Sequence, residues 1–415
     1  MNEIFNLKKQ KMRKIKHAKW LTILIFISLF VFSCSEENEF EDANTLVQEN
    51  FVELSFVKKI ANDIPFTSKN EYSKKGTSEV SFETKTVESI HESKNEKGKT
   101  SFYIINYVEG GFVILSADKR TEPILGFSED HKFIIDENSY PPGLKFWIND
   151  AIKQITQIQN SNIEQSEREK IAWEKVLSTG IIKTPNAAAK EPPIECYEHT
   201  EVFTNGPLLS STWQQLGGFN DALPFITCNG TNFQVFAGCV PIAMGQVMRY
   251  YQYPNNYDWA SMPLTSWGAT TTTANFIADI HDAIGNMYSG QPMYDCDGTG
   301  VSASANMGSV LKNQFNYSSA SWAGYDWNVV ESNIANYNRP VILSGDNGTT
   351  GHMWVCDGYR RTVYHFDDCT GVHYLKFYMN WGWGGTNNGW YSFDNFNPGN
   401  THYNNNKKMI YNIIP

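Results

Sequence analysis

Two patterns of apolar residues organise the chain between residues 100 and 160. Residues 101–108 and 112–116 are rich in β-branched and aromatic side chains, and the glycine-containing segment 109–111 joins them, which predicts a β-hairpin. Apolar residues then recur at helical spacing from 144 to 158, after Pro141-Pro142-Gly143, which predicts a helix. The region is therefore expected to fold as a small α+β unit.

The first residues have the pattern of an export signal. A basic segment precedes an apolar run from Trp20 to Phe32, which is too short to cross about 30 Å of hydrocarbon comfortably as a helix. Val31-Phe32-Ser33-Cys34 resembles a bacterial lipobox, whose cysteine is acylated and becomes the new N-terminus. The alternative is an ordinary cleaved signal followed by an incidental cysteine. Cys34 is thus the predicted lipidation site.

Acylation would hold the exported protein to outer-membrane lipid through Cys34. The acidic stretch 35–42 resembles the surface-export tag of Bacteroidetes lipoproteins and favours the cell surface. Release into the extracellular medium after processing is the alternative outcome.

Changes in composition divide the chain into five segments. Residues 183–193 contain three prolines and no periodic apolar face, which is typical of an exposed linker. The segments are a signal peptide 1–33, an acidic and polar tether 34–80, the α+β unit 81–182, a linker 183–195 and a large domain 196–415.

Charge and cysteine content narrow the function classes. The formal net charge is −10, the pI is near 5.4 and no basic stripe follows the signal, so a nucleic-acid partner is not expected. Export permits disulfides among the seven cysteines. Five would remain after one lipidated and one catalytic cysteine, so at least one more is unpaired, and the pairing stays open.

Cys239 is the candidate nucleophile. It immediately precedes a segment with helical character, and Pro241 fits a first helical turn. Unpaired backbone N–H groups at a helix N-terminus stabilise a thiolate over a thiol. A buried structural cysteine is the alternative.

His352 is the candidate general base. It follows Gly351 at the start of an apolar, strand-like run, where an imidazole can reach a cleft and exchange a proton with a thiol. Asn380 is expected to bond the other side of the imidazole, and the following Trp381 to shield that bond from water.

A tetrahedral intermediate needs donors for its oxyanion. The backbone N–H of Cys239 and the amide of Gln215 are the candidates, and Gln214 is the alternative register. Asp295-Cys296-Asp297-Gly298 is interpreted as a turn because the further ligands of a calcium loop are lacking. No Cys or His pair has zinc spacing, so neither a metal nor a cofactor is expected.

The chain resembles the streptopain family of papain-like cysteine peptidases in several segments taken in order. In the large domain these are Thr212-Trp213-Gln214-Gln215, Gly238 to Met244, Gly351-His352 with Asp357-Gly358-Tyr359, and Asn380 to Gly385. Upstream, residues 111–118 and 123–128 resemble the inhibitory prodomain of that family.

The resemblance implies an α+β fold, with a papain-like two-lobed cysteine peptidase domain at 196–415 preceded by a small α+β inhibitory prodomain at 81–182. It also implies a latent zymogen, broad endopeptidase activity on proteins or peptides, and the protein's own prodomain as intramolecular inhibitor. Ser304 and Gly351 would line the substrate cleft.

The chain departs from the family in a longer insert, 360–374, interpreted as polar and turn-rich with His365 and His373 exposed. A disulfide between Cys369 and Cys356 is left open. Two other functions stay open as well: acyl transfer by the same Cys–His pair, and a catalytically silent surface-binding or inhibitor protein on the same fold.

Overall fold

The computed structural model describes residues 50–67, 82–179, 199–346, 351–367, 370–392 and 407–415. The helices and strands below lie in one compact unit, Val52–Pro415. Three of the seven cysteines, Cys34, Cys196 and Cys369, fall outside the described residues, as does the expected linker. In the described part of the chain, no helix is long and apolar enough to span a membrane.

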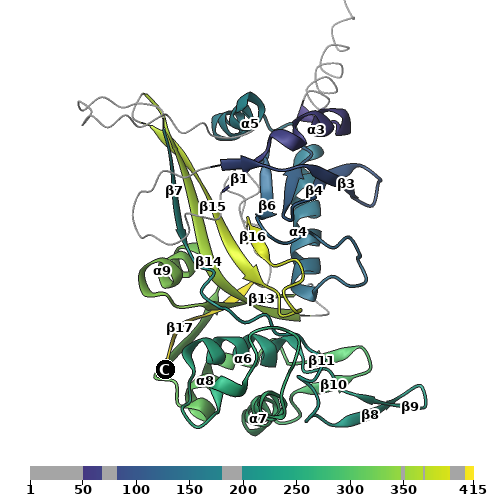
Figure 1. Ribbon diagram of the computed structural model, residues 1–415, viewed down its shortest axis with the longest axis vertical. Helices are drawn as coiled ribbons and strands as arrows, with labels where there is room; N and C mark the ends of the chain where they lie inside the picture. The colour runs from purple at the N-terminus through teal and green to yellow at the C-terminus, as the bar shows by residue number, and fades with distance from the viewer. Residues whose placement is uncertain (1–49, 68–81, 180–198, 347–350, 368–369, 393–406) are drawn as a thin grey trace, which may run out of the picture. The chain divides into compact units, whose positions relative to one another are not determined.

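The described residues from 52 to 179 form an N-terminal domain (Figure 1). Its elements are α3 (Leu54–Ile60), η1 (Ala61–Asp63), β1 (Pro65–Thr67), β2 (Phe82–Thr84), β3 (Val87–Lys94), β4 (Thr100–Tyr107), β5 (Phe112–Ser116), β6 (Ile124–Ser128), α4 (Pro142–Gln159) and α5 (Glu167–Thr179). Strands β3 to β6 follow one another in an antiparallel sheet. The predicted hairpin is confirmed as β4 and β5.

Helix α4 confirms the helix predicted at 144–158. Pro142 occupies its first turn, where a missing N–H costs nothing. Leu144, Trp147, Ala151 and Ile155 recur every three or four residues and are buried, so one face of the helix packs against the protein.

Part of the expected tether is folded. Residues 54–67 form α3, η1 and β1, and Val57, Ile60 and Ile64 are buried. The Tyr107 hydroxyl donates a hydrogen bond to the Ala61 carbonyl at 3.0 Å. The apolar residues recur at helical spacing within a polar stretch, so composition alone concealed a folded segment.

The described residues from 199 to 415 form a C-terminal domain with two lobes. Its elements are β7 (His199–Asn205), β8 (Phe225–Cys228), β9 (Thr231–Gln234), α6 (Cys239–Tyr251), η3 (Trp259–Ser261), α7 (Thr271–Met287), β10 (Met293–Asp295), β11 (Gly298–Gly300), α8 (Met307–Phe315), β12 (Ser319–Gly324), α9 (Trp327–Tyr337), β13 (Val341–Asp346), β14 (Gly351–His365), β15 (Gly371–Asn380), β16 (Gly389–Tyr391) and β17 (Lys408–Ile414).

Helices α6, α7 and α8 gather at one end of this domain and form the helical lobe, near the β8–β9 and β10–β11 hairpins (Figure 1). A disulfide between Cys228 and Cys296 joins these two hairpins. Cys296 and Asp297 make the turn between β10 and β11, as expected for residues 295–298.

The second lobe, the β lobe, is built on a sheet that continues into the N-terminal domain. The strand order is β12-β17-β13-β14-β15-β16-β6-β5-β4-β3, and β7 pairs with the outer half of β14. The junction is short: Trp390 and Tyr391 of β16 pair with Phe127 and Gly126 of β6. One sheet therefore spans both domains.

The expected polar insert is a long β-hairpin, so that interpretation was wrong. Residues 360–365 of β14 pair in register with 371–376 of β15. His373 is exposed, as expected, whereas His365 is partly buried. Cys356 is a free, buried thiol opposite Met379, which rules out the disulfide with Cys369. Alternation of outward polar and inward aromatic residues, such as Tyr364 and Tyr374, explains how a polar stretch forms strands.

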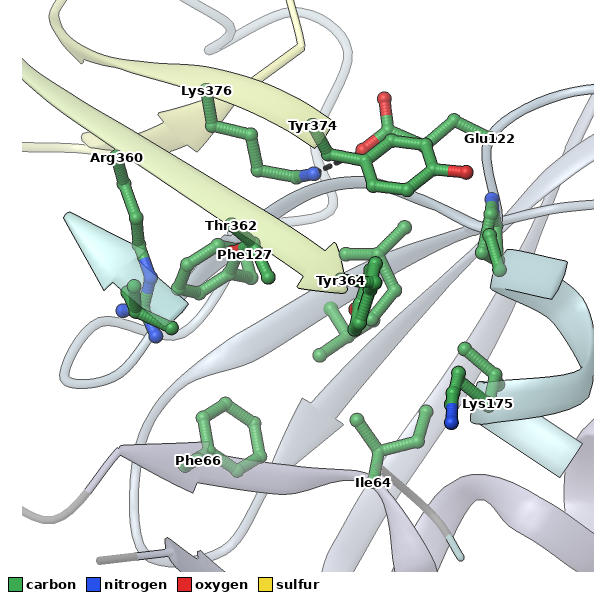
Figure 2. A pocket seen from close by; sticks show the side chains of 16 residues that line it. Ile64, Phe66, Glu122, Phe127, Lys175, Arg360, Thr362, Tyr364, Tyr374 and Lys376 are labelled. Atoms are coloured by element: carbon green, nitrogen blue, oxygen red, sulfur yellow. Dashed lines mark hydrogen bonds and ion pairs between the residues drawn. The ribbon is translucent and has the colours of Figure 1, made fainter. Parts of the chain in front are cut away.

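A cavity of about 110 Å³ lies between the hairpin and the N-terminal domain. Tyr364 and Tyr374 of the hairpin line it on one side, and Ile64 and Phe66 of the N-terminal domain on the other (Figure 2). At its rim, the Lys376 ammonium makes a buried ion pair with Glu122. The cavity is part of the interface between the domains.

Candidate active site

Cys239 is the first residue of α6, as predicted. Gly238 before it has φ +81°, and a Cβ there would lie 2.9 Å from the Thr299 carbonyl oxygen, so only glycine fits this approach to the helix. The backbone N–H groups of Met353, Cys239 and Val240 lie close enough to the thiol to lower its pKa. Cys239 and Met353 also pack against the same core, so the candidate nucleophile lies near the start of β14.

His352 is the second residue of β14 and precedes Met353. Alternation along the strand places its side chain on the same face as Trp354 and Cys356. Burial first, and then the positive charge of Lys145, lowers the pKa of His352 to about 4. Among the described residues, its imidazole makes no hydrogen bond to Cys239 or Asn380. The Cys239 thiol therefore lies near the residue that follows His352, but the two side chains are not hydrogen-bonded to each other.

The thiol of Cys239 differs from the expectation drawn from its helix position. Burial raises its pKa, and this effect outweighs the backbone N–H groups that lower it. The pair in this state is a neutral thiol and a neutral imidazole. Such a pair is a weak nucleophile, because the thiolate is the reactive form.

Asn380, at the end of β15, is held by partners other than the imidazole. Its Nδ2 donates to the Ser211 carbonyl at 2.8 Å, and its amide pairs with that of Gln246 at 3.3 Å in both directions. Gln246 is fully buried in α6 and also accepts the Trp213 N–H at 3.0 Å. Sequence analysis missed Gln246, although a lone amide in an otherwise apolar helical turn was a visible signal.

Trp381 is buried beside Asn380. Its ring centroid lies 5.4 Å from that of Trp354, and its Nε1 donates to the Asn387 carbonyl at 2.9 Å. It therefore forms part of an apolar wall next to the strand that carries His352.

The two neighbouring glutamines have different surroundings. Gln214 Nε2 donates to the Ser266 carbonyl at 3.3 Å. The Gln215 carbonyl accepts the Ala237 N–H at 3.0 Å, which places Gln215 against the segment that leads to Cys239. Within the described part of the chain, the side-chain amide of Gln215 makes no hydrogen bond. Its donor is thus available near the nucleophile, whereas that of Gln214 is occupied.

The two residues expected to line the cleft are exposed. Ser304 Oγ lies 2.9 Å from Ser302 Oγ, and Gly351 pairs with Asp346 next to His352. The strand preceding the Ser304 segment approaches the nucleophile, because Thr299 contacts Gly238.

Helix α4 of the N-terminal domain covers the strand ends that carry His352. A Cβ on Gly143 would lie 2.9 Å from ring atoms of both Trp354 and Trp381. The ring of Phe146 packs on Gly345, which is opposite His352 in the sheet register. Lys145 lies between these contacts in sequence, so the same helix turn supplies the charge that acts on His352.

A cysteine at a helix N-terminus in one lobe, a histidine at a strand start in the other, and a separate domain over the histidine define a class of protein. They are the features of a papain-like cysteine peptidase domain with its prodomain in place.

Comparison with known proteins supports this class. Residues 213–256 and 255–391 match the Peptidase C10 family, and residues 54–155 match the Spi protease inhibitor family. These matches identify the C-terminal domain as a cysteine peptidase domain of the Peptidase C10 type and the N-terminal domain as one of the Spi protease inhibitor type.

Individual relatives are distant. The chain is 24% identical to the thiol protease/hemagglutinin PrtT of Porphyromonas gingivalis over 343 residues, covering 73% of this chain but only 35% of PrtT. It is 24% identical to streptopain of Streptococcus pyogenes over 355 residues, covering 73% of this chain and 76% of streptopain.

A prointerpain A fragment from Prevotella intermedia has a similar structure, with a TM-score of 0.54 and 23% identity over 79% of this chain and 99% of that one. This likeness concerns the fold, and it confirms the fold class expected from the sequence.

Proposed function

We propose that the protein is an exported cysteine endopeptidase made as a latent zymogen, in which Cys239 is the nucleophile and His352 the general base. The observation that carries the proposal is the contact of the Cys239 thiol with the backbone of Met353, beside a histidine that α4 covers. The proposed nucleophile and base lie on neighbouring segments, and the N-terminal domain packs beside the segment that carries the base.

Hydrolysis would proceed in two steps. The Cys239 thiolate attacks the carbonyl carbon of the scissile bond, and the imidazolium of His352 gives its proton to the departing amine. The resulting thioester is then attacked by water, which loses a proton to His352, and the acid product leaves with the thiol restored. The Cys239 N–H and the Gln215 amide would stabilise each oxyanion.

Asn380 would orient the imidazole after a rearrangement. In the described state Gln246 and the Ser211 carbonyl fix this amide. Its oxygen is therefore already in position to accept a hydrogen bond from His352 once the imidazole turns toward Cys239. Trp381 would exclude water from that bond.

Latency follows from the shared position of α4 and His352. The N-terminal domain buries the imidazole and adds the Lys145 charge, and both effects disfavour the imidazolium that a thiolate requires. A tethered domain acts at high effective concentration, so modest affinity maintains the block until the linker at 183–195 is cut.

Export and anchoring complete the proposal. The signal at 1–33 and the cysteine at position 34 support a lipoprotein that reaches the outer membrane, with protein or peptide substrates outside the cell. Membrane partition of wild type and Cys34→Ala tests this: the variant should be soluble and lack lipid mass on its N-terminal peptide.

The decisive test uses an iodoacetamide or epoxide probe and a peptide substrate. Cys239→Ser and His352→Ala should each remove nearly all hydrolysis after activation while leaving the unfolding transition in place. Cys356→Ser is the matched control, because Cys356 is the other free thiol of the described residues and is buried. Hydrolysis within a few-fold of wild type by either site variant would refute the assignment, and amine capture in place of hydrolysis would indicate acyl transfer.

A further inference from the structure

Three potential metal ligands meet on the outer half of β14, away from the active site. His199, the first residue of β7, pairs directly with His365, the last residue of β14, and Glu201 lies two residues along β7. Directly paired residues and alternate residues share one face of a sheet, so all three side chains project from the same face. Their ligand atoms all lie within 4.8 Å of one another.

The imidazoles converge on the carboxylate. Nε2 of His365 lies 3.1 Å from one oxygen of Glu201, and Nε2 of His199 lies 4.0 Å from the other. The two rings are stacked, with centroids 4.3 Å apart and planes 8° from parallel. One ion pair involves only two of these three side chains. A cation held by both imidazoles and the carboxylate uses all three ligand atoms, which lie within 4.8 Å of one another.

The surroundings suit a metal ion. The three side chains are 28%, 35% and 36% exposed, so a hydrated ion can reach them without opening the fold. They occupy the face of the hairpin opposite the interdomain cavity, because the alternate residues Val202 and Tyr364 line that cavity. The site therefore does not depend on contact with the N-terminal domain.

We propose that His199, Glu201 and His365 form a zinc site that fastens the first strand of the C-terminal domain to β14. Two imidazoles and one carboxylate are a ligand set that zinc accepts, with bonds of about 2.0–2.2 Å and a fourth position for water. Tetrahedral bonds of that length set the ligand atoms about 3.3 Å apart, so these atoms would move by about 1 Å on binding. The two stacked rings would also turn out of their parallel arrangement, because a metal ion bonds an imidazole nitrogen in the plane of its ring.

The position of the site gives it a role. β7 follows the linker at 183–195 and pairs with β14 through all of its residues, from His199 opposite His365 to Asn205 opposite Tyr359. That the linker is cut rests on the proposed function. The cut would make β7 a terminal strand, and terminal segments fray unless they are tied down. Zinc bound to the first residue of β7 would tie it down at its free end.

Zinc binding is measured on the full chain carrying Cys239→Ala, which removes the reactive thiol as a competing ligand. Titration against a chromogenic chelator at pH 7.5 should give one zinc ion per chain that is lost in His199→Gln and in His365→Gln. Each substitution should weaken the affinity by more than about 100-fold, since even outer-shell partners contribute about 10- to 100-fold. His373→Gln is the matched control: it is a histidine on β15, opposite Val363 on the same sheet face, and should bind zinc like the parent.

Cobalt provides a readout that needs no variant. The parent loaded with Co²⁺ should show the visible absorption of a four-coordinate site with nitrogen and oxygen ligands and without thiolate charge-transfer bands. Unaltered zinc affinity in the His199→Gln/His365→Gln double variant, thiolate bands in the cobalt spectrum, or no binding by the parent would each overturn the proposal.

Hydrogen exchange tests the role of the site. Zinc should slow amide exchange in residues 199–205 of the full chain, and His365→Gln should abolish that protection although it removes no residue from β7. Equal exchange with and without zinc would overturn the fastening role. Neither measurement uses peptidase activity, so a chain that binds zinc yet hydrolyses no peptide would refute the proposed function and leave the metal site standing.

Discussion

The two hydrophobic cores of the molecule differ in where their residues come from. The core of the helical lobe is made wholly by the C-terminal domain, around Trp213, Met244 and Ile277. The core of the β lobe is shared: Leu144 and Trp147 of the N-terminal domain pack in one cluster with Trp354, Trp381 and Tyr391. The first core uses residues of the C-terminal domain alone, whereas the second takes a wall from the N-terminal domain.

Strand β14 divides the two cores. Met353 and Val355 pack with the helical-lobe core, and Trp354 and Cys356 with the shared core. Cys239, the proposed nucleophile, packs against the helical-lobe core, and His352, the proposed base, lies on the strand face that looks toward the shared core. Under these proposed roles, the N-terminal domain would silence the enzyme through His352, without distorting the helix that presents the thiol.

The largest expected effect comes from the charges that border the shared core. Lys376→Ala would leave Glu122 buried without its ion-pair partner, which costs about 3–5 kcal/mol. The free energy of unfolding of the full chain should fall by that amount, and probe labelling of Cys239 in the uncleaved chain should speed up.

Lys132→Ala is the matched control for Lys376→Ala, because it breaks an exposed ion pair with Glu88 within the N-terminal domain. Exposed pairs contribute about 0–1 kcal/mol, so little change is expected. Equal effects of the two substitutions would show that the shared core is not strengthened by its buried charges.

The next prediction concerns the pH dependence of stability and Asp357, a buried carboxyl at the place where the two cores meet. Burial raises the pKa of this carboxyl to about 7, although its Oδ2 accepts the Leu209 N–H at 2.8 Å. Between pH 4 and 7 the unfolded chain loses this proton while the folded chain keeps it, so the contribution of Asp357 to stability falls as pH rises, by about 1.4 kcal/mol per pH unit. The lowered pKa values of His352 and His281 contribute in the opposite direction, so the effect of Asp357 is the difference between the slopes of the parent and of a variant without this carboxyl. Denaturant unfolding of the inactive Cys239→Ala chain at several pH values measures the slope.

Asp357→Asn should remove the contribution of Asp357 from the slope, because an amide does not ionise. Asp282→Asn, an exposed position on α7, should leave the slope in place. The same pH dependence of stability in the parent and in Asp357→Asn would contradict the raised pKa.

The protonation of His352 should report whether the shared wall is present. Its pKa is about 4 in the described state, and removal of the N-terminal domain should raise it toward the ordinary value near 6.5. The pH dependence of Cys239 alkylation, or the imidazole NMR signals, follows the change. Lys145→Ala should give a smaller rise in the pKa of His352, since burial is the larger cause of its lowering. An unchanged pKa of His352 after removal of the N-terminal domain would contradict the link between burial and latency.

The smallest expected effect is a difference in probe labelling between variants of two helical glycines, each of which faces a tryptophan. A methyl group on Gly143 would press on Trp354 and Trp381 at 2.9 Å in the shared core, and one on Gly245 would press on Trp213 at 3.0 Å in the helical-lobe core. Both Gly→Ala variants should lose about 1–3 kcal/mol from overpacking. Probe labelling of the uncleaved chain should rise for Gly143→Ala alone, and a similar rise for Gly245→Ala would end the distinction between the cores.

Local signals in the sequence predicted the elements that depend on local rules. The helix that starts at Cys239, the strand that starts beside His352 and helix α4 all follow from apolar spacing and proline position. The pattern shows that one face of α4 is buried, but it carries no information on which domain supplies the opposite wall. The shared core therefore could not be read from the sequence.

Residues whose roles depend on partners far away in the sequence could not be predicted, for a related reason. His199 and His365 are 166 positions apart by number and meet only through strand register. Gln246 is bound to Asn380 from a different lobe, so its role shows only in the folded chain. The catalytic roles of Cys239, His352 and Gln215 stay predictions, because the described state is the blocked one.

The short pairing between β6 and β16 has a consequence for the enzyme after activation. When the N-terminal domain departs, the backbone of β16 loses its neighbour, and an unpaired strand edge is a template for other chains. Only three residues, Gly389–Tyr391, would be uncovered, a length that limits self-association. Because the pairing between β6 and β16 is short, the N-terminal domain can separate from the C-terminal domain. For the same reason, the exposed strand edge limits association between copies of the processed enzyme.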